Sequence, residues 1–357
     1  MLNFTIGPVM SNKDVLSVSA ESSPYFRTRE FSEIMLENER MMLDFLAAPE
    51  NSRCVFLTAS GTGAMESCVM NILNETDKVI VINGGTFGQR FVELCQIHQV
   101  NFTEVRCEYG KQVKKCELDL LNDKGYTALL VNMNETSSGL LYNMELISDF
   151  CNKNHILLIV DGISAFISDE INMEKIGAAA IITGSQKALA VQPGVSIIAL
   201  TPQAINRIES NKEKCMYLSL KQALTNMERG QTPFTPAVTI LLQINIRLKR
   251  ILQNGGIEAE RNKIIDLVNY FRKQIIAYPF EMFVEDKSNA VTALRTNSVS
   301  ADDVVRILKD DYQIWVCPNG GEYKDKVFRV GHIGDLSKFK YDMLFSALDD
   351  MKKRKLI

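Results

Sequence analysis

Short apolar runs alternate with amphipathic segments over much of the chain. Segments between most of these runs repeat small and apolar residues at helical spacing, as at Ala64, Cys68 and Ile72. Continuous apolar strands that alternate with helices are typical of a mainly parallel sheet covered by helices on both faces. The pattern therefore predicts an α/β fold whose seven-stranded sheet is formed by residues 54–59, 78–83, 102–107, 127–134, 156–162, 178–184 and 195–201.

The pattern changes after the proline-rich stretch QTPFTPAV. Two long amphipathic helices are predicted there, over about 237–253 and 257–277, and short strands and a closing helix follow them. Helices and strands that are separated along the chain favour a smaller α+β unit. We expect three parts: a large α/β domain over 15–236, a small α+β domain over 237–357, and an N-terminal segment, 1–14, that packs near the small domain.

Composition narrows the class of protein. The chain has 357 residues, 46% hydrophobic and 23% charged, with a formal net charge of −3. This balance offers no basic footprint for nucleic acid, and no apolar run is long enough to span a membrane. The N-terminus lacks the pattern of a signal peptide. Eight cysteines form no C-x-x-C pair and three histidines have no metal-ligand spacing. We therefore expect a cytoplasmic protein with free thiols and no metal site.

One lysine, Lys187, lies in the turn that follows an apolar run, in the stretch GSQKAL. Burying an ammonium is costly unless it is paired or neutralised. Desolvation lowers the pKa of a lysine, and its neutral amine can then form a Schiff base with an aldehyde. The position of Lys187 indicates a catalytic amine, which needs an aldehyde partner and a group that accepts electrons.

A possible phosphate site follows the first strand, in the stretch TASGTGAME. Ser60, Gly61, Thr62 and Gly63 lead directly into a predicted helix. The free N–H groups and the dipole at a helix N-terminus favour an anion. An ordinary helix cap would have the same residues, so this signal alone is weak.

Three more strand ends carry candidate residues. Asp161 closes ILLIVDG and could pair with a protonated pyridine nitrogen. Phe87, in NGGTFGQRF, could stack on an aromatic ring, and the hydroxyl-rich turn NETSSGLL could bind a phenolic oxygen. Each has a plainer explanation: an Asx turn, a core aromatic and a polar loop. Because ligands of open α/β sheets bind at the carboxyl ends of the strands, the set together matches pyridoxal 5′-phosphate (PLP).

Along nearly its whole length the sequence resembles the fold-type I, class V aminotransferases. The resemblance runs from IGPV at 6–9 to FRVGHIGD at 328–335. GSQKAL is similar to the lysine motif of the alanine–glyoxylate and serine–pyruvate members of that family. FRVGHIG is similar instead to the 2-aminoethylphosphonate–pyruvate transaminases. The resemblance implies an enzyme with PLP as its cofactor.

The resemblance also implies the residues around the reactive part of the cofactor. Lys187 would hold PLP and then move the proton between substrate atoms. Asp161 would pair with the pyridinium nitrogen. Phe87 would stack on one face of the ring, and Ile163 would pack on the other.

Further roles follow from the same resemblance. Thr136 would lie near the phenolic oxygen, and Arg329 would clamp the substrate carboxylate with its planar fork. Thr235 would reach the phosphate bound by a neighbouring subunit, which implies a homodimer with shared active sites. The phosphate itself would be held by four residues: Ser60, Gly61, Thr62 and Gln186.

The reaction implied is transamination by ping-pong Schiff-base chemistry, with a small amino donor and a keto acid as partners. We favour 2-aminoethylphosphonate as donor and pyruvate as acceptor, because of residues 327–336. The alternative, from GSQKAL, is alanine or serine with glyoxylate or pyruvate. A phosphonate would need a second cation besides Arg329, and Arg27 and Arg29 are the nearest candidates in the sequence.

Three other functions fit less well. A cysteine desulfurase could use Cys317 as its nucleophile, but that group is expected to carry histidines where this sequence has Gln186 and Phe87. A nicotinamide-dependent dehydrogenase would leave Lys187 unexplained. A non-catalytic protein with this fold would have no reason to keep the lysine, the aspartate and the arginine together.

Overall fold

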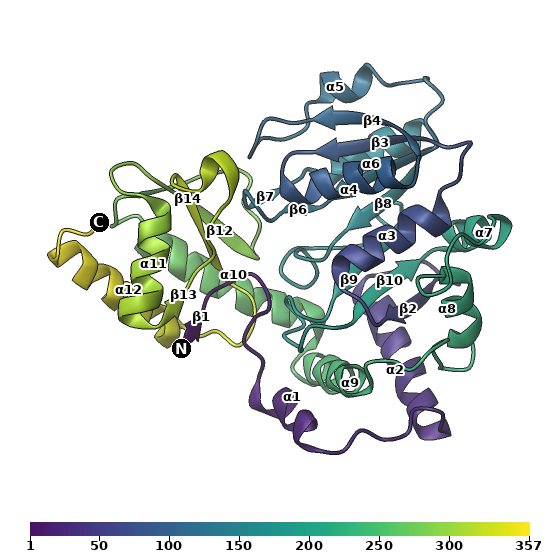
Figure 1. Ribbon diagram of the computed structural model, residues 1–357, viewed down its shortest axis with the longest axis horizontal. Coiled ribbons are helices and arrows are strands. Elements are labelled where there is room, and N and C mark those ends of the chain that lie inside the picture. Colours follow the sequence, from purple (N-terminus) through teal and green to yellow (C-terminus); the bar gives the residue numbers. More distant parts are fainter.

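The computed structural model describes residues 1–357 and is built around a seven-stranded sheet (Figure 1). The strand order is β2-β10-β9-β8-β5-β3-β4, and only β10 runs antiparallel to its neighbours. The prediction of a mainly parallel seven-stranded sheet is confirmed. The strands are β2 (Arg53–Leu57), β3 (Lys78–Asn83), β4 (Asn101–Arg106), β5 (Ala128–Asn132), β8 (Leu157–Asp161), β9 (Ala178–Gly184) and β10 (Ser196–Leu200).

Helices join these strands and pack along the sheet (Figure 1). Every residue of the central strands β5, β8, β9 and β10 is buried, which is why their sequences are largely apolar. A short hairpin, β6 (Asn134–Glu135) and β7 (Leu140–Leu141), follows β5. The helices of this part are α1 (Lys13–Ser17), α2 (Arg29–Phe45), α3 (Gly61–Ile72), α4 (Thr86–Ile97), α5 (Lys115–Asp119), α6 (Met144–Lys153), α7 (Pro202–Ser210) and α8 (Leu220–Met227).

A smaller unit, at the left of Figure 1, contains both chain termini. Its antiparallel sheet has the order β11-β12-β14, and a separate pair joins β1 to β13 in parallel. The N-terminal Phe4 is fully buried in the apolar cluster of this unit. Its elements are β1 (Leu2–Asn3), β11 (Phe280–Met282), β12 (Val291–Thr296), α11 (Ala301–Tyr312), β13 (Ile314–Trp315), β14 (Val327–Gly331) and α12 (Lys338–Lys353).

Two helices link the units. The buried face of α9 (Val238–Gln253) packs against α2 and belongs to the larger apolar cluster. In α10 (Gly256–Ile275), Ile264 and Val268 join the larger cluster, whereas Phe271 and Ile275 join the smaller one. The domain boundary expected at residue 237 stays a prediction, but the contacts of α9 lie on the large side.

The architecture brings the loops after β2, β3, β5, β8 and β9 to one edge of the sheet, because these strands all run in the same direction. Each candidate residue near the cofactor follows one of these strands. None of the helices combines the length with the apolar character that crossing a lipid bilayer requires.

Candidate active site

A cavity of about 240 Å³ opens at this edge of the sheet. Five segments that are distant in sequence supply its walls, together with residues of the N-terminal segment. It is lined by nine residues expected from the sequence: Ser60, Gly61, Thr62, Phe87, Thr136, Asp161, Ile163, Gln186 and Lys187. The structure therefore places most of the expected set around one space.

Lys187 lies in a tight loop that follows β9. The loop is closed by a hydrogen bond from Ala190 N–H to Lys187 O, 2.8 Å long, and Lys187 lines the cavity. Burial lowers the pKa of Lys187 to about 8, while the charge of Asp161 opposes this shift. The neutral amine is therefore far more abundant near neutral pH than it is in a lysine of ordinary pKa.

Gly7, in the N-terminal segment, lies close to this lysine. A Cβ added at Gly7 would lie 3.0 Å from Lys187 Cδ and 3.2 Å from Nζ. The φ of Gly7 is +150°, which L side chains rarely adopt. The segment IGPV therefore forms part of the site, since Gly7 and Pro8 both line the cavity.

Asp161 ends β8 and is only 5% exposed. Its Oδ1 accepts a hydrogen bond of 2.9 Å from the Ile163 N–H. Burial raises the pKa of Asp161 to about 6, although that hydrogen bond and the charge of Lys187 pull it down. A cation beside this carboxylate would stabilise its ionised form, so the site suits a protonated ring nitrogen.

Two helix N-termini, those of α3 and α4, adjoin the cavity, and only that of α3 is free to bind an anion. At α3 the N–H groups of Gly61, Thr62 and Gly63 donate to no acceptor in the chain. The Ser60 hydroxyl makes no capping hydrogen bond either. These are the donors that a phosphate group requires.

The N-terminus of α4 is neutralised by Glu135, a fully buried carboxylate. Its oxygen Oε2 accepts from Phe87 N–H at 3.2 Å and from Gly88 N–H at 3.0 Å. The same oxygen accepts from the Asn132 side chain at 3.0 Å. Glu135 thus fixes the first turn of α4, which includes Phe87. The N-terminus of α3 keeps its free N–H groups and is therefore the one available to bind a phosphate.

Gly61 also permits a close approach that a larger residue would prevent. A Cβ at Gly61 would overlap Cδ1 of Ile163 on the opposite wall. Thr136 is buried and donates to the Ser164 hydroxyl at 2.7 Å. The cavity therefore offers free phosphate donors, a buried carboxylate, an aromatic ring and a reactive amine, and these residues fit PLP.

The other two expected residues lie outside the cavity lining. Arg329, on β14, donates from Nη1 to Thr136 O at 2.9 Å and from Nη2 to Pro318 O at 2.6 Å. Its buried Nε has no partner in the chain. Thr235 is exposed, in a loop next to Phe234, so its expected contact with a second subunit stays a prediction.

The structure gives Arg27 and Arg29 other tasks. Arg27 donates to the Gln231 side chain at 3.1 Å and to the carbonyls of Thr232 and Pro233 at 2.9 and 3.1 Å. Arg29 forms an exposed pair with Glu33 at 2.9 Å. Neither arginine lines the cavity.

Arg90 lines it instead, and the sequence reasoning missed this residue. Arg90 lies one turn after Phe87 on α4, and its guanidinium carbon is 5.0 Å from the centre of the Phe87 ring. It forms no ion pair and no hydrogen bond within the chain. The spacing of three residues from Phe87 was the available signal, because such residues share one helix face.

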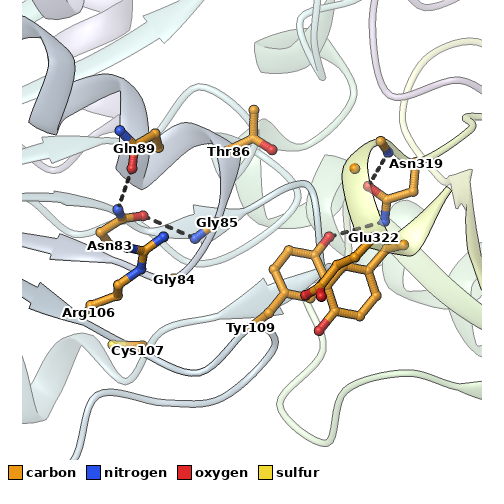
Figure 2. Close-up of a pocket in the computed structure, with 13 residues that line it drawn as sticks. Asn83, Gly84, Gly85, Thr86, Gln89, Arg106, Cys107, Tyr109, Asn319 and Glu322 are labelled. Carbon is orange, nitrogen blue, oxygen red and sulfur yellow. Dashed lines mark hydrogen bonds between the residues drawn. The ribbon is translucent and has the colours of Figure 1, made fainter.

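A second, larger cavity of about 500 Å³ is lined by Gly84, Gly85 and Thr86 before and at the start of α4, and by the loop 319–323 of the small unit (Figure 2). Its buried Asn83 is already satisfied, since its amide donates to Gln89 at 3.0 Å and to Glu104 at 2.8 Å. This cavity contains neither the lysine nor the free α3 terminus, so the smaller cavity is the candidate active site.

Comparison with known proteins agrees with this geometry. The family model named aminotransferase class-V matches residues 15–322. An uncharacterised aminotransferase of Methanocaldococcus jannaschii is 30% identical over 335 residues, 92% of this chain and 86% of the relative. The L-aspartate–glyoxylate aminotransferase of Paracoccus denitrificans is 29% identical over 296 residues, 79% of this chain and 74% of the relative.

The fold has close counterparts among solved structures. The aspartate aminotransferase of Thermus thermophilus matches with a TM-score of 0.90 at 24% identity, over 98% of this chain and 99% of that one. With a family match over most of its length and a cavity that fits the cofactor, the chain belongs to the class V aminotransferases and is a PLP-dependent enzyme of fold type I.

Proposed function

We propose that this aminotransferase moves an amino group from a small anionic amino donor to a 2-oxo acid, glyoxylate or pyruvate, in two half-reactions at one site. One observation carries the proposal: the amine of Lys187, with a pKa lowered by burial to about 8, lines the same cavity as the buried carboxylate of Asp161. When bound, PLP supplies an aldehyde for the amine and a ring that accepts electrons.

Each residue of the site has its own role in the reaction. Once a donor has displaced it, Lys187 regains a neutral amine, which takes the proton from the donor α-carbon and returns it to a neighbouring atom. Asp161 would pair with the ring nitrogen and keep it protonated. The free donors at Ser60, Gly61 and Thr62 would hold the phosphate and so keep the ring in place through both half-reactions.

Phe87 would stack on one face of the ring, and Ile163 would pack on the other. Phe87 keeps its place because Glu135 fixes the N-terminus of α4. Thr136 serves the phenolic oxygen and Gln186 the phosphate. Arg329 binds the carboxylate of the 2-oxo acid, a task for which its planar guanidinium is suited.

The free charge of Arg90 bears on the choice of donor. An arginine that lines the cavity without a carboxylate partner favours a substrate with a negative group in addition to the one held by Arg329. A dicarboxylic amino acid such as aspartate meets this condition, and the named activity of the Paracoccus denitrificans relative uses aspartate with glyoxylate.

2-Aminoethylphosphonate with pyruvate is the second candidate pair. It lacks an α-carboxylate but carries a dianionic phosphonate, which Arg329 and Arg90 could bind together. The motif at residues 327–336 favours it. Alanine and serine, favoured by GSQKAL, would leave Arg90 without a substrate partner.

We further propose a homodimer in which Thr235 completes the phosphate site of the second subunit. The loop with Thr235 lies beside a stacked pair of aromatic rings, Tyr217 and Phe234, with centroids 5.6 Å apart. Met216, next to Tyr217 in the sequence, is 68% exposed, and so is Tyr25, whose neighbour Phe26 accepts a hydrogen bond from the Gln231 side chain. Exposed apolar side chains of this size mark interaction surfaces where they cluster. Light scattering of the purified protein measures the oligomeric state, and a monomer at micromolar concentration would contradict the dimer.

A panel of donors tests the substrate proposal. The PLP form is mixed with L-aspartate, 2-aminoethylphosphonate, L-alanine or L-serine, and the loss of its visible absorbance is followed over time. We expect aspartate or the phosphonate to react fastest. Faster reaction with alanine or serine would refute the anionic-donor proposal, and no reaction with any amino compound would refute the proposed function itself.

A further inference from the structure

Two adjacent carbonyls at the active-site turn are bound by residues of the small unit. Thr136 O accepts from Arg329 Nη1 at 2.9 Å, and Ser137 O accepts from Asn319 Nδ2 at 3.0 Å. The turn that holds Thr136 at the cavity is thus also the point where the small unit is attached to the large one.

Asn319 and Arg329 lie on two segments that backbone hydrogen bonds join. Cys317 and Arg329 form an isolated antiparallel bridge, with backbone hydrogen bonds of 2.8 Å in both directions. Pro318 O accepts from Arg329 Nη2 at 2.6 Å. A shift of the segment 317–319 would therefore remove one of the two carbonyls that orient the guanidinium.

Tyr109 secures this attachment from the large unit (Figure 2). Its hydroxyl donates to Ser137 O and accepts from Asn319 Nδ2 at 3.0 Å. Its ring stacks on Tyr323, with centroids 4.2 Å apart and planes at 22°, and touches Phe283 at 5.5 Å. Burial raises the pKa of Tyr109, so the phenol keeps the proton that it donates.

We propose that Tyr109, Asn319 and Ser137 form a latch that positions Arg329 for the substrate carboxylate. The proposal rests on the proposed function, because it concerns how the same site binds its substrates. Arg329 has three N–H groups left after its bonds to Thr136 and Pro318, counting the unpaired Nε. A guanidinium held in one plane presents these donors to a carboxylate without first losing rotamer freedom.

The latch predicts which ligands depend on it for binding. Every amino donor or 2-oxo acid that uses Arg329 should bind less well when the latch is broken. Hydroxylamine, a small nucleophile that reacts with bound PLP and has no carboxylate, should not depend on it. General damage to the cofactor site would instead slow both kinds of reaction.

The test uses the full-length enzyme loaded with PLP and the variants Tyr109→Phe and Asn319→Ala. We expect KM for the 2-oxo acid to rise roughly tenfold in each, the loss typical of one hydrogen bond that orients a charged group. The matched control is Tyr126→Phe, because the buried Tyr126 hydroxyl donates to Thr103 at 2.8 Å away from the latch. The hydroxylamine rate of each latch variant should equal that of the control.

A double-mutant cycle separates positioning from general destabilisation. Adding Tyr109→Phe to Arg329→Ala should raise KM no further, because the arginine to be positioned is already absent. Additive effects in this cycle, or an equal slowing of hydroxylamine, would overturn the latch. An unchanged KM in Tyr109→Phe overturns only the latch, whereas a wild-type enzyme that transaminates no donor overturns the proposed function and this inference with it.

Discussion

Gly7 and Lys187 lie so close together in the active-site cavity that a Cβ added at Gly7 would be 3.0 Å from Lys187 Cδ, although 180 residues separate them along the chain. The strand β1 just before Gly7 pairs with β13 of the small unit. The N-terminal segment therefore runs from the sheet of the small unit to the cavity wall beside the reactive amine.

This contact predicts the effect of Gly7→Ala. The added methyl group would crowd Lys187 Cδ and Nζ, so we expect kcat to fall by more than the loss of folding stability explains. Gly256→Ala is the matched control, since Gly256 also has a positive φ, +83°, but nothing within 4 Å of its added Cβ. Steady-state rates and thermal unfolding of both variants check this. Equal losses of kcat in the two variants would contradict the crowding argument.

The close approach of Gly61 to Ile163 predicts a defect in PLP binding that a second substitution repairs. Gly61→Ala should weaken PLP binding, because the new Cβ overlaps Ile163 Cδ1 and separates the two walls of the cavity. Ile163→Val removes that Cδ1, so the double variant should recover much of the affinity. Titration of apoprotein with PLP measures the dissociation constant. Gly320→Ala, where an added Cβ meets nothing, is the control. A double variant no better than Gly61→Ala would show that the overlap is not the cause.

The substitution Asp161→Asn removes the negative charge of this side chain and keeps its shape. The amide oxygen can still accept the Ile163 N–H, so the loop after β8 should keep its form. The negative charge opposite the ring nitrogen is lost, and kcat should fall by roughly 10²–10³, the scale found when a group that stabilises developing charge is removed. Asp149→Asn, on the exposed side of α6, is the control. Turnover within a factor of about two of wild type would exclude the role proposed for Asp161.

The pKa of Lys187 predicts how PLP attachment depends on pH. Only the neutral amine attacks the aldehyde, and the pKa of Lys187 is lowered by burial to about 8. The attachment rate of apoprotein should rise with pH below about 8 and level off above it. Because Asp161 raises the pKa of this lysine, Asp161→Asn should move the midpoint to lower pH. Stopped-flow absorbance at a series of pH values follows the attachment. A midpoint near 10.5, the ordinary lysine value, would contradict the effect of burial.

The strands and the residues at their ends could be predicted because both depend on local sequence. Parallel strands buried on both faces are largely apolar; Asp161 ends one such strand, and Lys187 lies three residues after another. The chemistry of the site was therefore readable at the points where the apolar pattern stops. The resemblance to a known family then supplied the individual roles.

The arginines could not be assigned in this way, because their partners lie far away in the sequence. Arg27 reaches carbonyls about 205 residues distant, and Arg329 reaches Thr136 across 193 residues. No periodicity records such contacts. Arg90 was overlooked for the opposite reason: it has an ordinary place on an amphipathic helix, and only the assembled cavity reveals its free charge.

The role of Glu135, a buried polar group, could not be predicted from the sequence either. In the sequence it is one residue of a hydroxyl-rich turn, and a surface loop was the simpler interpretation of NETSSGLL. The structure buries it fully against the N-terminus of α4, where backbone N–H groups satisfy the carboxylate. A carboxylate can be buried without a cationic partner only when such donors surround it.

The most direct test of the central claim is the location of the covalent link between enzyme and cofactor. The holoenzyme is reduced with borohydride and digested, and the peptides are analysed by mass spectrometry, alongside Lys187→Ala and the exposed-lysine control Lys175→Ala. We expect a pyridoxyl group on Lys187 in the wild type and in the control, and neither label nor turnover in Lys187→Ala. A label on a different lysine, or normal turnover by Lys187→Ala, would contradict the central claim.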